Sequence, residues 1–199
     1  MSLDTSTLYL VATLVAALLG VMLLYFGRQE NIAALKWWGA AYILGASSVA
    51  AWTLTNPLLA RELSLTLNAV GFVACGMVWG AARVFHGRSP NWPGIVIGAF
   101  VWMSAICFFT PATPSMRMTI GAAIVAAYAV LTASELLTER RKSMHRRWPS
   151  FAVPALHGFV LMLPILLGDY FLGDDETFAD SIWATLFAIE LVLYALGTA

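Results

Sequence analysis

Two ionisable side chains that lie inside apolar segments are the residues of this chain most able to do chemistry. Glu190 lies near the middle of the last apolar run, residues 178–199, and His157 lies in the run before it, residues 150–172. An ionisable group is costly to place within a membrane-spanning helix and is therefore a functional candidate. We predict that Glu190 contacts a ligand or senses protons inside a helix bundle. The alternative is a protonated carboxyl group that hydrogen-bonds to a neighbouring helix and only fixes packing.

The depths of these two residues allow them to meet. At 1.5 Å per residue, His157 lies about 9–10 Å and Glu190 about 13–14 Å from the same end of the predicted helices. The two helices are neighbours in sequence, so a contact is feasible. Because histidine changes charge near neutral pH, such a contact could bias the position of the last helix. The alternative for His157 is an imidazole satisfied by a backbone carbonyl or a hydroxyl group.

Two prolines and three further side chains complete the predicted ligand site. Pro154 and Pro164 lie in the same predicted helix as His157, and each removes a backbone hydrogen bond and favours a kink. We therefore predict a hinge at these prolines and a pocket beside this helix; a kinked helix without a ligand is the alternative. The other predicted ligand-binding residues are Trp79, Asn68 and Tyr194.

The sequence contains no motif typical of an enzyme, and it predicts no metal site and names no cofactor. A retinal Schiff base needs a lysine within a late helix, whereas Lys36 and Lys142 lie in predicted loops. A haem held by two histidines needs a second one at the depth of His157, but His86 and His145 lie at or beyond the membrane interface. We therefore do not expect catalysis by this chain.

The elements that must position these residues are predicted from composition. Of the 199 residues, 60% are hydrophobic and 11% charged, and the mean hydropathy is +0.79. A soluble domain carries about 25% charged residues, so we predict an all-α polytopic membrane protein with a single domain over residues 1–199. Seven apolar segments are long enough to span a bilayer: 7–27, 37–55, 65–86, 93–110, 115–138, 150–172 and 178–199.

The distribution of basic residues predicts the orientation of these helices. Nine of the eleven Lys and Arg residues lie in or beside the first, third and fifth loops, whereas the second and fourth keep only Arg61 and Arg117. Because cytoplasmic loops carry an excess of Lys and Arg, the N-terminus is predicted outside and the C-terminus in the cytoplasm. The last run ends without an interfacial anchor, so we expect its helix to lead into a further, cytoplasmic part.

Three stretches resemble a known bacterial family. Residues 37–45 read WWGAAYILG, residues 65–71 read LTLNAVG, and residues 76–88 read GMVWGAARVFHGR. These runs resemble the N-terminal membrane regions of GGDEF-type diguanylate cyclases. The resemblance implies a sensory input module in the bacterial inner membrane, a homodimer in the full-length protein, and control of cyclic-di-GMP synthesis. No GGDEF sequence is present here, so a cyclase would have to follow Ala199.

These observations favour one function and leave a second open. We predict a membrane sensor domain that binds a small apolar or amphipathic ligand between its helices and transmits the signal through the last helix. The alternative is a small proton-coupled transporter that uses Glu190 as its coupling acid. A membrane haem protein is a third possibility. The predicted partners are the lipid bilayer and a small molecule, and nothing in the charge distribution suggests nucleic acid.

Overall fold

The computed structural model describes residues 5–55, 61–108, 114–137 and 148–171, together with Leu186, Ile189, Glu190, Leu193 and Tyr194. Within this part the chain is all-helical, and six of the predicted segments are confirmed as helices. These are α1 (Thr5–Gln29), α2 (Ala33–Thr55), α3 (Arg61–Phe85), α4 (Trp92–Phe108), α5 (Pro114–Leu137) and α6 (Trp148–Phe171).

The predicted seventh helix, residues 178–199, lies mostly outside the described residues. The five residues described there are all in helical conformation. Their spacing of i, i+3, i+4, i+7 and i+8 is that of one face of a helix. We call these five residues, Leu186, Ile189, Glu190, Leu193 and Tyr194, the C-terminal stripe.

The length and composition of the helices indicate a membrane protein. Three stretches are long and apolar enough to span a membrane, namely Thr7–Gln29, Leu65–Phe85 and Thr119–Leu137. The apolar stretches Trp92–Phe108 and Ala152–Leu163 are shorter. Large apolar side chains are exposed on the outside of the bundle, among them Leu14 and Phe100. Exposed apolar surface of this extent is unusual on a soluble monomer and suits contact with lipid.

Two short turns join helices at the same end of the bundle, and both follow the Schellman pattern. After α1, Asn31 has a φ of 53°, and the amide of Ile32 donates to the carbonyl of Gly27. After α3, Gly87 has a φ of 74°, and the amide of Arg88 donates to the carbonyl of Arg83. A residue in the left-handed region is what this helix-ending motif requires, and Gly and Asn adopt that conformation most readily.

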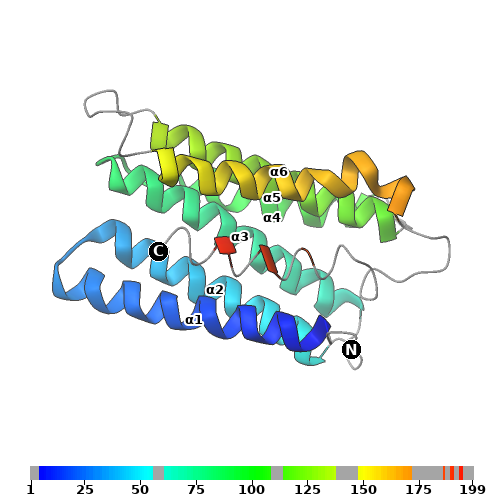
Figure 1. Ribbon diagram of the computed structural model, residues 1–199, viewed down its shortest axis with the longest axis horizontal. Helices are drawn as coiled ribbons and strands as arrows, with labels where there is room; N and C mark the ends of the chain where they lie inside the picture. The colour runs from blue at the N-terminus through cyan, green and yellow to red at the C-terminus, as the bar shows by residue number, and fades with distance from the viewer. Residues whose placement is uncertain are drawn as a thin grey trace.

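Helix α3 lies at the centre of the arrangement (Figure 1). It packs against α2, α4 and α5, while α1 packs on α2 and α6 packs on α5. The α1–α2 pair therefore lies on one side of α3, and α4, α5 and α6 lie on the other. The described parts of the C-terminal stripe, drawn in red in Figure 1, lie between these two groups.

Glycines allow α3, α4 and α5 to approach closely. A Cβ atom added at Gly76 would collide with the carbonyl oxygen of Ile95 on α4. One added at Gly98 would lie 2.6 Å from the ring of Tyr128 on α5. Such distances leave no room for a side chain. The small-residue patterns of helices 3 and 4 therefore serve packing within the chain, as their sequence spacing favours.

Candidate functional site

A cavity of about 430 Å³ lies in the middle of the helix bundle. Its wall comes from α1, α2, α3, α5, α6 and the C-terminal stripe, and the contributing residues lie near the middle of most of these helices. Cavities of 300–1,000 Å³ are typical of small-molecule sites. Small side chains on α2 and α3 make much of the space, namely Ala41, Gly45, Ala46, Gly71 and Ala74.

Most hydroxyl groups on the wall are bonded to backbone carbonyls. Thr13 donates to Tyr9 O at 2.7 Å, and Thr132 donates to Tyr128 O at 2.8 Å. Ser48 on α2 donates across to Leu67 O on α3 at 2.6 Å. These hydroxyls have already used their proton, so the wall offers a ligand mainly apolar surface.

The polar chemistry of the cavity is concentrated at one contact. His157 Nδ1 on α6 lies 2.6 Å from Oε1 of Glu190, and the two side chains are 10% and 14% exposed. A nitrogen and an oxygen this close must share a proton, because a deprotonated nitrogen and a carboxylate would only repel each other. The contact that the helix depths allowed is therefore present in the structure, and it joins α6 to the C-terminal stripe.

Tyr194 completes this contact. Its ring stacks on the His157 imidazole with 4.1 Å between centroids and 24° between planes. Tyr194 and Glu190 are one helical turn apart, so the C-terminal stripe presents a carboxyl group and an aromatic ring to the same histidine. His157 is thus fixed in orientation by both, and any group that displaces it must disturb both contacts. We call these three residues the His157 triad.

Asn68 also borders the cavity, from α3. Its amide has no hydrogen bond to any residue in the described part of the chain. A half-buried amide without a partner among the described residues is suited to contact a polar ligand group or a water molecule. Four of the five predicted ligand-binding residues, Asn68, His157, Glu190 and Tyr194, therefore lie around one cavity.

Trp79, the fifth, occupies a different place. It belongs to a buried apolar cluster with Phe72, Trp102 and Tyr128, and its ring fills the space above Gly94. The guanidinium of Arg83 lies 5.3 Å from the centre of the Trp79 ring, within range of a cation–π contact. Trp79 is not among the residues that line the cavity; its surroundings are those of a packing residue.

The predicted hinge residues lie within a single helix. Helix α6 runs without interruption from Trp148 to Phe171 and includes both Pro154 and Pro164. Pro154 is fully buried, one turn before His157; the side chain of Pro164 lies outside the described residues. Since His157 and Leu161 line the cavity, α6 does border the main pocket. A hinge motion at the prolines stays a prediction.

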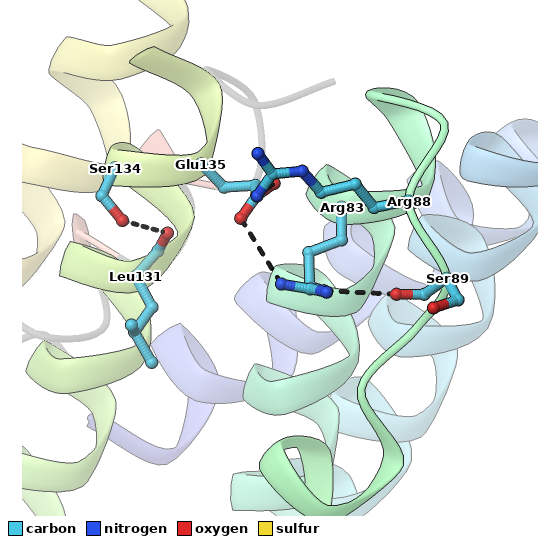
Figure 2. Close-up of polar contacts among 6 residues, drawn as sticks. All are labelled: Arg83, Arg88, Ser89, Leu131, Ser134 and Glu135. Atoms are coloured by element: carbon cyan, nitrogen blue, oxygen red, sulfur yellow. Dashed lines mark hydrogen bonds and ion pairs between the residues drawn. The ribbon is translucent and has the colours of Figure 1, made fainter. Parts of the chain in front are cut away.

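A second buried acid lies away from the cavity, at the end of the bundle that holds the two Schellman turns. Figure 2 shows Glu135 of α5 between two arginines. Arg88 Nη1 is 3.0 Å from Glu135 Oε1, and Arg83 Nη1 is 3.8 Å from Oε2. Arg83 Nε also donates to the carbonyl of Ser89 at 3.2 Å. The partners of Glu135 are therefore one arginine in the last turn of α3 and one in the turn that follows α3.

Sequence reasoning missed the small residues that create the cavity. Ala41 and Gly45 on α2, and Gly71 and Ala74 on α3, were inside segments predicted only as spanning helices. Their i, i+3 and i+4 spacing on two helices that are consecutive in sequence is a signal that could have been used. It does not by itself distinguish a close helix crossing from an empty space.

No protein-family model, curated protein or solved structure matches this chain. The residues around the cavity therefore carry the functional argument, and the similarity of residues 37–45, 65–71 and 76–88 to cyclase membrane regions stays a prediction.

Proposed function

We propose that this chain is a multi-pass sensory domain of the bacterial inner membrane. Its central cavity binds a small apolar or amphipathic ligand, and binding changes the position of the C-terminal stripe relative to α6. The proposal includes the predicted orientation, with the N-terminus outside and the C-terminus in the cytoplasm. The output is a cytoplasmic signalling enzyme, and the resemblance described above makes a diguanylate cyclase the first candidate.

The single observation that carries this proposal is the contact between His157 and Glu190 on the cavity wall. It connects α6 to the C-terminal stripe through groups that both face the ligand space. A ligand that hydrogen-bonds to either group competes with the contact. A ligand shifts a conformational equilibrium only as far as it binds the two states differently, and competition for this contact supplies that difference.

The experiment is a distance measurement between α6 and the C-terminal stripe. Nitroxide labels placed at Leu166 and Leu193, both exposed, report the separation by pulsed electron resonance after Cys75 and Cys107 are replaced by alanine. His157→Phe keeps an aromatic ring for Tyr194 and removes the nitrogen that meets Glu190. We expect the distance distribution to shift or broaden.

Glu30→Gln is the matched control, because Glu30 is an exposed acid in the α1–α2 turn; it should leave the distances unchanged. Identical distances in His157→Phe and the unmodified protein would refute coupling through this contact. The same preparation in proteoliposomes tests the transporter alternative: proton uptake that Glu190→Gln abolishes would favour a carrier over a sensor.

A further inference from the structure

A second hollow lies on the outside of α6 and shares two residues with the central cavity. This groove, of about 360 Å³, is lined on the α6 side by Val153, Leu156 and Val160. On the other side it is lined by the whole C-terminal stripe. Glu190 and Tyr194 belong to the wall of the groove and to the wall of the cavity. The side chains of Glu190 and Tyr194 therefore lie between the groove and the cavity.

The groove opens toward the lipid side of the bundle. Leu156 and Leu193 on its opposite walls are each 62% exposed, and Leu186 and Ile189 are exposed as well. On α6 the groove residues 153, 156 and 160 follow one face, and the cavity residues 157 and 161 follow the adjacent one. The His157 triad lies where the two faces meet.

We infer that the groove is a lateral entrance through which a neutral, single-chain amphiphile passes from the bilayer into the central cavity, with the His157 triad as its gate. The inference rests on the proposed ligand-binding function and adds the route and the class of ligand. The apolar groove accommodates the chain of such a molecule, since all of its residues except Glu190 and Tyr194 are aliphatic.

The chemistry of the gate selects the head group. Oε1 of Glu190 is taken by His157, while Oε2 has no hydrogen bond to any described residue and remains an acceptor. A head group that donates a hydrogen bond, such as a hydroxyl, is therefore favoured. An anionic head group such as a carboxylate has no proton to donate, so it would place its acceptor oxygens against the acceptor Oε2 without a hydrogen bond.

The route is tested with a photoreactive probe, 1-dodecanol that carries a diazirine in its chain, added to the protein in nanodiscs. After short illumination at increasing times, mass spectrometry locates the labelled residues. In the unmodified protein we expect labels first on the groove residues of α6 and later on cavity residues of α2 and α3. Leu156→Trp and Leu193→Trp each fill the groove from a lipid-exposed position, so neither should disturb folding.

In both variants we expect the labelling rate of the cavity residues to fall about tenfold, the effect of about 1.4 kcal/mol of added barrier. Leu14→Trp is the matched control, because Leu14 is 59% exposed on α1 and lines neither hollow. In this variant the labelling rate of the cavity residues should be unchanged. Cavity labelling at the unmodified rate in both groove variants would refute the proposal that the groove is the entrance. Absence of labels from groove and cavity in the unmodified protein would refute the proposal that the ligand is an amphiphile.

Competition then tests the head group. Unlabelled dodecanol should suppress cavity labelling, whereas dodecanoate at pH 8 should not; equal suppression by the two would overturn the assignment to a neutral donor. Failure of this inference is distinguishable from failure of the proposed function. The distance change in His157→Phe needs no ligand and does not depend on the entry route, so it decides the coupling by itself.

Discussion

The α3–α4–α5 packing region and the central cavity both depend on small residues, but the small residues have opposite effects there. At Gly76 and Gly98 the missing side chain lets a neighbouring helix or ring come into direct contact. At Gly45 and Gly71 an added Cβ would meet its nearest neighbours only at 3.4 and 3.5 Å, which is ordinary van der Waals contact. Small residues thus bring α3, α4 and α5 into close contact and leave space where α2 and α3 line the cavity.

Two acids, Glu135 in the packing region and Glu190 at the cavity, differ in a similar way. Glu135 faces two arginines, which keep their charge at all physiological pH values, and one of them stacks on Trp79. Glu190 faces one histidine across a single 2.6 Å contact at the boundary of a cavity. An acid held by permanent charges within tight packing stabilises the fold. An acid that shares a proton beside a cavity can change its contact when a ligand enters the cavity.

The largest loss of stability is expected for Gly98→Ala. The new methyl group would lie 2.6 Å from the Tyr128 ring and 3.0 Å from its hydroxyl oxygen, and hydrogen bonds to the backbone of α4 hold that hydroxyl in place. Overpacking of this kind costs about 1–3 kcal/mol, and we expect the upper part of that range. The free energy of unfolding in mixed micelles under SDS titration measures it. A loss below about 0.5 kcal/mol, the range of neutral substitutions, would contradict the assignment of a closed region.

The next largest loss of stability is expected for Glu135→Gln, which we compare with Glu190→Gln. The first removes the charge that pairs with Arg83 at 3.8 Å and with Arg88 at 3.0 Å, and breaking a fully buried ion pair costs about 3–5 kcal/mol. Because the Arg88 side chain is half-exposed, solvent weakens its attraction to Glu135. We therefore expect Glu135→Gln to lower the free energy of unfolding by about 1–2 kcal/mol.

Glu190→Gln should cost less, since glutamine can still hydrogen-bond to His157 and one face of the site is open. The same SDS titration compares the two variants. If Glu190→Gln destabilised the protein more than Glu135→Gln, the roles given to the two acids would be reversed.

A smaller effect is expected for Tyr128→Phe. The Tyr128 hydroxyl accepts from the Gly98 amide at 3.0 Å and donates toward the carbonyls of Gly94 and Ile95 at 2.8 and 3.0 Å. Those backbone groups also take part in α4, so the loss should be about 1 kcal/mol. Tyr25→Phe, at an exposed position on α1, is the control and should be neutral. If Tyr128→Phe left the free energy of unfolding unchanged, apolar packing without these hydrogen bonds would account for the contact between α4 and α5.

The sequence predicted the helices well because each is a long apolar run that ends at polar residues, Pro or Gly. Hydropathy does not state which face of an apolar helix turns inward, and that is why Trp79 and Asn68, both on α3, could be placed in one predicted site. The structure turns Asn68 to the cavity and Trp79 to α4, since Gly94 leaves room for the indole ring.

The partners of the ionisable residues were predictable to different degrees. Glu190 and His157 lie on consecutive segments at similar depth, so chain order and helical rise made their contact feasible, and the structure shows it. Glu135 lies close in sequence to a basic run, residues 140–147. Its contact with Arg83 and Arg88 depends on α3 packing beside α5, which local charge patterns do not encode.

The smallest change in stability is expected for Gly45→Ala and Gly71→Ala, which test the cavity half of the comparison. Their new methyl groups would meet Ala74 and Ser48 at ordinary contact distances, so the free energy of unfolding should stay within about 0.5 kcal/mol. Each methyl group nevertheless occupies space that a ligand would use. A misfit of one methyl group in an apolar site is worth about 1 kcal/mol of binding free energy, so equilibrium labelling by the dodecanol probe should need more probe in both variants. If these substitutions destabilised the bundle as much as Gly98→Ala, the space between α2 and α3 would be a packed contact, and the difference between the two halves would disappear.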